Sequence, residues 1–169
     1  MTEHVKQLLD RMADELRHGL QDKSITDPGL VGIHSGGVWV AEQLQSRLQL
    51  EAPLGRLDIS FYRDDFSRIG MHPQVKPSSI PFSVEDRHIL LVDDVLFTGR
   101  TIRAAMNEIF DYGRPASVTL VVLVERDGRE LPIQAQVVGE HLKLNPDQQV
   151  KLRGPEPLHL DIVQLEASS

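Results

Sequence analysis

Cysteine is absent from this chain of 169 residues, and several features of common protein classes are missing with it. Without cysteine there are no disulfides, no thiolate metal ligands and no thiol nucleophile. No apolar run is long enough to cross a membrane as a helix, so no membrane partner is expected. The first residues lack a basic segment followed by an apolar one, which argues against a signal peptide. These absences favour a cytoplasmic protein.

Positive charge is also scarce, because the net charge is −7. An acidic protein repels nucleic acid on average, so any RNA-binding surface must be a confined basic patch. Of the 18 basic residues, 13 are arginine, whose planar guanidinium suits phosphate. The seven histidines show no metal-ligand spacing. The 40% of hydrophobic residues can supply the core of one ordinary domain, predicted to span residues 1–169.

The periodicity of apolar residues predicts an alternation of helices and strands. Helical spacing predicts helices over 5–16, 38–48 and 102–110, with Gly19 and Gly113 as the caps of the first and third. Apolar or alternating runs predict strands over 30–33, 57–62, 89–92, 118–124, 136–139 and 158–163. Such an alternation favours an α/β fold, in which helices flank a central, mostly parallel sheet.

Residues 63–84 interrupt this pattern, because periodicity vanishes there among prolines, serines and charged residues. A loop of about twenty residues in a compact domain is usually functional or disordered. We therefore expect residues 63–84 to form a functional or a disordered loop.

The stretch Ile89–Thr101 carries the strongest functional signal. Four apolar residues lead into the acid pair Asp93-Asp94, and a short turn with Thr98 and Gly99 precedes the next predicted helix. Open α/β sheets bind ligands at the carboxyl ends of their strands, and a glycine-containing turn before a helix suits a phosphate. Carboxylates beside a phosphate cradle indicate a ribose phosphate. A lone acid pair would more simply be a solvated strand end.

The stretch Val92–Thr101 resembles the phosphoribosyl-pyrophosphate (PRPP) loop of type I phosphoribosyltransferases. Three further segments, Asp58–Asp65, Gly113–Pro115 and Val124–Ile133, are similar in order to the PyrR family of pyrimidine operon regulators. The resemblance covers roughly residues 5–145. It implies the type I phosphoribosyltransferase fold, with a flexible loop and a small hood region.

The PyrR resemblance also implies an activity and partners. Members of the family convert uracil and PRPP to UMP and diphosphate with Mg²⁺, so a transferase of this kind is expected here. They also bind leader RNA of pyrimidine biosynthetic genes, respond to uridine nucleotides and PRPP, and commonly form homo-oligomers (dimer or higher). Two alternatives stay open: a weakly catalytic or non-catalytic regulator that senses UMP and PRPP, and a purine phosphoribosyltransferase.

The resemblance assigns roles to the residues of Ile89–Thr101. Asp93 and Asp94 would hold the ribose 2′- and 3′-hydroxyls, and their negative charge would stabilise a cation-like ribose during transfer. Thr98 and Thr101 would bind the 5′-phosphate, although either could simply cap the helix. The other residues expected to bind PRPP or UMP are Ser35, Gly36, Gly37, Val95, Leu96, Phe97, Gly99, Arg100, Val124 and Arg126.

Two segments are expected to bind the diphosphate part of PRPP. Arg63 would contact it as a third catalytic residue, while Asp64 and Asp65 could organise magnesium-bound waters, unless these charges form a solvent-exposed cluster. The turn Ser35-Gly36-Gly37 would bind it through backbone N–H groups, unless it is a simple tight turn. Typical PyrR sequences resemble Thr-Arg-Gly here, so one guanidinium is missing from this chain, which leaves open whether binding leads to catalysis.

Overall fold

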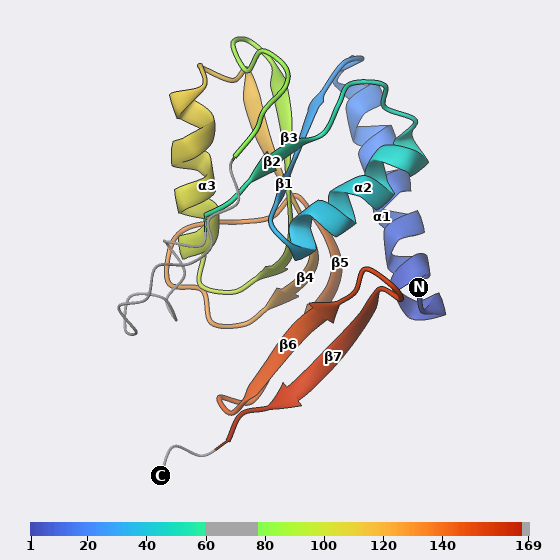
Figure 1. Cartoon of the computed structure of the whole chain (residues 1–169), viewed down its shortest axis with the longest axis vertical. Coiled ribbons are helices and arrows are strands. Elements are labelled where there is room, and N and C mark those ends of the chain that lie inside the picture. The colour runs from blue at the N-terminus through green and yellow to red at the C-terminus, as the bar shows by residue number, and fades with distance from the viewer. Residues whose placement is uncertain (60–77, 167–169) are drawn as a thin grey trace.

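The computed structural model describes residues 1–59 and 78–166 and has a parallel sheet between two layers of helices (Figure 1). The helices are α1 (Glu3–Asp22), α2 (Gly36–Leu48) and α3 (Arg100–Asp111). The strands are β1 (Gly29–Ile33), β2 (Gly55–Leu57), β3 (His88–Leu96), β4 (Ser117–Arg126), β5 (Val137–Leu142), β6 (Gln148–Arg153) and β7 (His159–Gln164). The sheet has the order β2-β1-β3-β4-β5, and all its pairs are parallel. The predicted α/β class is therefore confirmed.

Both faces of the sheet are buried. Helices α1 and α2 cover one face and α3 covers the other (Figure 1). Because successive strand residues point to opposite faces, Leu90 and Val92 join the α1–α2 side whereas Ile89 and Leu91 join the α3 side. Burial on both faces explains the continuous apolar run of β3, which is typical of a central parallel strand.

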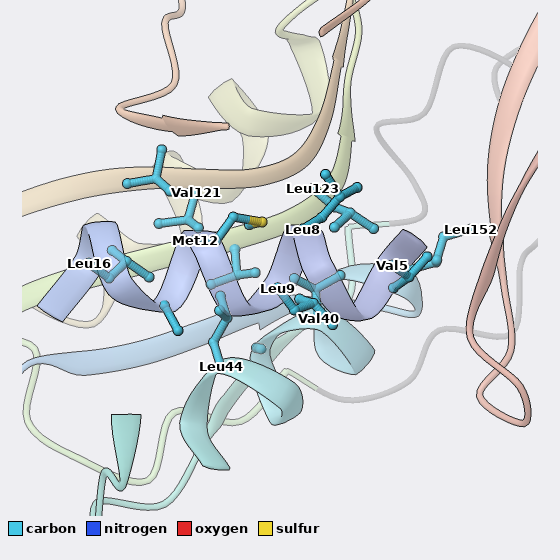
Figure 2. Packing of buried hydrophobic residues seen from close by; sticks show 14 of the residues in the cluster. Val5, Leu8, Leu9, Met12, Leu16, Val40, Leu44, Val121, Leu123 and Leu152 are labelled. Carbon is cyan, nitrogen blue, oxygen red and sulfur yellow. The ribbon is translucent and has the colours of Figure 1, made fainter. Parts of the chain in front are cut away.

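Helix α1 supplies much of the first cluster through one apolar stripe (Figure 2). Val5, Leu9 and Met12 recur at helical spacing and are at most 1% exposed. They pack against α2, β4 and the hairpin β6–β7, as the figure shows for Leu44, Val121 and Leu152 respectively. At its N-terminus, the Thr2 hydroxyl accepts a hydrogen bond from the backbone N–H of Val5, so Thr2 caps the helix.

Several predicted boundaries are wrong. Helix α1 continues past Gly19 to Asp22, so Gly19 is no cap, and α2 begins at Gly36 rather than after the glycine turn. Strand β3 continues four residues past the predicted end at Val92, because its backbone pairs with β4 as far as Leu96. Strand β6, which pairs with β7 in an antiparallel hairpin, was not predicted. Figure 1 places this hairpin beside the carboxyl ends of the sheet strands, where a hood region is expected.

The end of the predicted loop 63–84 packs against the sheet, whereas its residues 63–77 lie outside the described part. Ser79 forms a backbone bridge with Arg56, and Val84 is 1% exposed. The Ser78 hydroxyl accepts a hydrogen bond from the Asp58 backbone N–H and donates one to Glu108. Among residues 1–59 and 78–166, no helix is long and apolar enough to cross a membrane.

Candidate active site

A cleft of about 700 Å³ opens at the carboxyl end of the sheet. Its walls come from four places in the sequence: the start of α2, the end of β3 with the following turn, the end of β4, and the hairpin. Most residues predicted to bind the ligand line it: Ser35, Gly36, Asp93, Asp94, Val95, Leu96, Phe97, Thr98, Gly99, Thr101 and Arg126. This is the edge at which open parallel sheets hold ligands.

The two neighbouring carboxylates of the cleft have different surroundings. Asp93 is 2% exposed, and one of its oxygens accepts the backbone N–H of Asp94 at 2.8 Å. Asp94 is half-buried and accepts the backbone N–H of Val95 at 2.8 Å. Each acid therefore has one oxygen fixed by the backbone. This arrangement places two oriented acceptors where a polyhydroxylated ligand would lie.

The turn from Phe97 to Gly99 joins β3 to α3 and ends at an open helix N-terminus. Gly99 occupies the N-cap position with φ +96°, a backbone conformation that favours glycine, and it offers no side chain as a cap. The Thr98 hydroxyl accepts the backbone N–H of Arg100 at 3.2 Å. The remaining N–H groups of the first turn of α3, together with the helix dipole, suit a phosphate.

The turn before α2 brings glycine against the acid pair. The side chain of Ser35 does not cap α2, whose first residue is Gly36. A Cβ added to Gly36 would lie 2.2 Å from an Asp94 carboxylate oxygen. A Cβ added to Gly37 would lie 2.6 Å from the Val92 carbonyl oxygen. The two glycines thus allow the N-terminus of α2 to approach the end of β3 closely.

Some predicted site residues lie elsewhere. Gly37 packs against β3 rather than lining the cleft, and Val124 is fully buried in the core. The side chain of Arg100 forms an ion pair with Glu130 at 3.0 Å, outside the cleft lining. Arg63, Asp64 and Asp65 lie outside the described residues.

The hairpin contributes cleft residues that the sequence did not predict. Gln148, Gln149 and Lys151 from β6 line the cleft, as does Trp39 from α2. The alternation of Val150 and Leu152 with polar neighbours was the signal that could have revealed β6. At the end of β4, the guanidinium of Arg126 lies 4.0 Å from the centre of the Phe97 ring and donates to the Gln148 carbonyl of the hairpin at 3.1 Å. Arg126 therefore connects the sheet, the turn and the hairpin.

The fold is that of a phosphoribosyltransferase domain. Residues 2–155 match the model of the phosphoribosyl transferase domain family. The chain is 60% identical over 165 residues to the bifunctional protein PyrR of Nitrosococcus oceani, with 96% of this chain and 93% of that protein covered. It is 58% identical over 163 residues to that of Pseudomonas paraeruginosa, with 96% of both chains covered. The chain therefore belongs to the PyrR family of phosphoribosyltransferase-domain proteins.

Solved structures agree on the fold. The hypoxanthine phosphoribosyltransferase of Trypanosoma cruzi superposes with a TM-score of 0.71 and covers 97% of this chain, with 94% of its own length matched. Sequence identity is 20%, so this likeness concerns the backbone arrangement alone. Together with the family match, it confirms the predicted type I phosphoribosyltransferase fold.

Proposed function

We propose that this protein is a uracil phosphoribosyltransferase that also regulates pyrimidine biosynthesis genes. The observation that carries the proposal is the cleft itself, in which the Asp93-Asp94 pair stands beside the open N-terminus of α3. The acids suit ribose hydroxyls, and the helix N-terminus suits the 5′-phosphate. Similarity to bifunctional PyrR proteins favours uracil over a purine as the base.

In the proposed reaction, the bond from ribose C1 to the diphosphate of PRPP breaks and a bond from C1 to N1 of uracil forms. Diphosphate leaves with the bonding electrons, and the proton of uracil N1 is released. Positive charge develops on the ribose as the bond to diphosphate breaks, as in glycoside cleavage. The carboxylates of Asp93 and Asp94 stabilise that positive charge. Because both are already held in place, the barrier is lowered without reorganisation of the site during the reaction.

We propose that Mg²⁺ enters the site bound to PRPP. Mg²⁺ keeps several waters and usually binds through one or two carboxylates plus substrate phosphates. The half-buried Asp94 carboxylate in the cleft fits that mode. When bound, the ion would neutralise charge on the diphosphate. Asp64 and Asp65 remain candidates for holding its waters.

The weakly catalytic alternative has an observation in its favour. In the described part of the cleft, the cationic side chains are Arg126 and Lys151, and Arg126 is engaged by Phe97 and the hairpin backbone. The start of α2, where diphosphate is expected to bind, offers Ser35 and Gly36 and no guanidinium. The lack of a guanidinium at the diphosphate position is expected of a protein that binds UMP and PRPP but catalyses the transfer slowly.

An assay of UMP formation distinguishes these two functions. Labelled uracil is incubated with PRPP, Mg²⁺ and the protein, and labelled UMP is separated and counted. We expect product above a protein-free control. Binding of PRPP without product would establish the sensing function and exclude the enzyme.

A double variant tests the acid pair under both functions. We expect Asp93→Ala with Asp94→Ala to abolish PRPP binding in calorimetry, because the oriented acceptors of the ribose hydroxyls are lost. Asp10→Ala, which removes an exposed carboxylate of α1 paired with Arg47, is the control and should bind PRPP as the parent protein does. Normal PRPP binding by the double variant would show that the site is wrongly assigned.

The remaining parts of the proposal concern partners and organisation. Leader RNA of pyrimidine genes is the proposed regulatory ligand, and uridine nucleotides with PRPP are the proposed effectors. A homo-oligomer is proposed because Phe110 and Tyr112, at the end of α3, are 56% and 46% exposed. We also infer a single domain over 1–169, since both hydrophobic clusters share one sheet. A cytoplasmic location belongs to the proposal as well.

A further inference from the structure

Residues 129–133 pack against the Phe97–Gly99 turn, the proposed phosphate-binding turn, on the side opposite the cleft. The Thr98 carbonyl accepts hydrogen bonds from the backbone N–H groups of Glu130 at 2.9 Å and Leu131 at 3.1 Å. A Cβ added to Gly99 would lie 3.0 Å from Ile133, so the segment touches the turn closely. None of residues 129–133 lines the cleft. The turn therefore lies between this segment and the ligand site.

Arg129 is the side chain that ties this segment to the turn. Its guanidinium donates to the Phe97 carbonyl, to the Ile133 carbonyl at 2.9 Å and to the Glu125 carboxylate. Glu125 belongs to β4 and pairs in register with Leu96 at the end of β3. The side chains of Arg129 and Glu125 are 24% and 19% exposed. The guanidinium of Arg129 thus links β4, residues 129–133 and the Phe97–Gly99 turn.

These contacts fix the direction in which the backbone N–H groups of the Phe97–Gly99 turn point. In a planar trans peptide the carbonyl and the N–H point in opposite directions. Because the carbonyls of Phe97 and Thr98 are held toward residues 129–131, the following N–H groups, those of Thr98 and Gly99, face the other side. Neither N–H has a hydrogen-bond acceptor among the described residues. Two free donors beside the N-terminus of α3 therefore point toward the cleft.

We propose that Arg129 is a positioning residue for 5′-phosphate binding, acting through the Phe97–Gly99 turn. The inference rests on the proposed function, in which this turn holds the phosphate of PRPP and UMP. Lysine cannot replace Arg129, because an ammonium is a point charge that lacks the planar fork needed to reach three separated acceptors. The role concerns the phosphate, because the donors whose direction Arg129 fixes are the backbone N–H groups of Thr98 and Gly99.

The test compares UMP with uridine, which lacks the phosphate. Binding of each is measured by calorimetry and by the fluorescence of Trp39, the only tryptophan of the chain, which lines the cleft. We expect Arg129→Lys to weaken UMP binding about tenfold, as for one or two lost hydrogen bonds, and to leave uridine binding unchanged. In turnover, KM for PRPP should rise while kcat changes less.

Arg87→Lys is the matched control. Arg87 also donates to a backbone carbonyl and a carboxylate, both of Asp27 and both at 3.0 Å, and its side chain is 19% exposed. It lies outside the cleft lining, so its replacement should change neither affinity. If Arg129→Lys does not fold, Glu125→Gln loosens the same guanidinium, and the same selective loss of UMP affinity is expected.

The possible failures are distinguishable. If the parent protein binds neither UMP nor PRPP, the proposed function itself is wrong. If the parent binds UMP and Arg129→Lys binds it equally well, Arg129 does not position the turn. An equal loss of UMP and uridine affinity would also overturn the inference, because it would indicate general damage to the cleft.

Discussion

Asp93 and Asp94 differ in exposure although both carboxylates lie beside the start of α2. A Cβ added to Gly37 would lie 3.1 Å from an Asp93 oxygen, and one added to Gly36 would lie 2.2 Å from an Asp94 oxygen. Asp93 is 2% exposed, whereas Asp94 is half-buried. The Asp94 carboxylate fills space that a side chain at Gly36 would need. The acid pair and the glycine turn, 57 residues apart in the sequence, therefore form one unit.

This contact predicts the effect of adding one methyl group at Gly36. In Gly36→Ala, the new Cβ would lie 2.2 Å from the Asp94 carboxylate oxygen and 2.9 Å from its Cβ, so the acid must move. We expect the affinity for PRPP to fall about tenfold in calorimetry, because Asp94 loses its orientation toward the ribose. The free energy of unfolding should fall by about 1–3 kcal/mol, because Asp94 must shift at its Cβ as well as at its carboxylate.

A double-mutant cycle locates the cause of that effect. If the methyl group acts through Asp94, then Gly36→Ala should cost less stability in an Asp94→Ala background than in the parent protein. The melting temperatures of the four proteins provide the comparison. Equal costs in both backgrounds would show that the clash lies elsewhere.

At the scale of elements, the middle of most helices and sheet strands was predictable, whereas their ends and the strand β6 were not. The apolar run of β3 was visible, but Asp93 and Asp94 suggested the end of a strand because charged residues are rarely buried. Their backbone nevertheless continues the ladder with β4, and one oxygen of each carboxylate accepts a neighbouring backbone N–H. A single sequence does not reveal such local compensation.

Gly19 gives a second example, because its position looked like a helix end. The helix continues to Asp22, where α1 is closed by backbone bonds from Lys23. Gly19 has no positive φ, and an added Cβ would have nothing within 4 Å. Gly19 is therefore an ordinary glycine inside a helix. Ordering it costs conformational entropy, and no neighbour occupies the space that a side chain would fill.

We accordingly expect Gly19→Ala to stabilise the protein. Alanine is favoured over glycine inside a helix by about 1 kcal/mol, which corresponds to a rise in melting temperature of about 2–4 °C for a domain of this size. Thermal unfolding followed by circular dichroism measures the shift. A fall in melting temperature would instead fit a glycine that needs a left-handed backbone, as a helix cap does.

At the scale of the whole molecule, the sheet topology explains why part of the site was predictable. The glycine turn follows β1, and the acid pair and the Phe97–Gly99 turn lie at the end of β3, so the parallel topology brings them to the same edge. Gln149 and Lys151 reach this edge from a hairpin whose strands pair only with each other. Its placement depends on packing of Val150 and Leu152 into the α1 cluster, which no local pattern encodes.

Charge is also organised across the whole molecule. Seven described arginines form ion pairs with carboxylates: Arg17, Arg47, Arg56, Arg87, Arg100, Arg129 and Arg153. A paired arginine must give up its carboxylate before it can bind an RNA phosphate, whereas an exposed, unpaired one need not. Arg114 is exposed and has no carboxylate partner for its side chain among the described residues, while Arg17 lies 2.7 Å from Asp14.

This difference predicts how leader RNA binding depends on salt. Affinity measured by electrophoretic shift should fall between 50 and 200 mM KCl, by about twentyfold if three phosphates are contacted, because each contact releases counterions from the RNA. Arg114→Gln should lower the slope of log affinity against log salt by about one, and Arg17→Gln should leave it unchanged. An unchanged slope in Arg114→Gln would exclude this arginine from the RNA surface. Binding that salt does not weaken would mean that a protein with net charge −7 recognises its RNA without phosphate contacts.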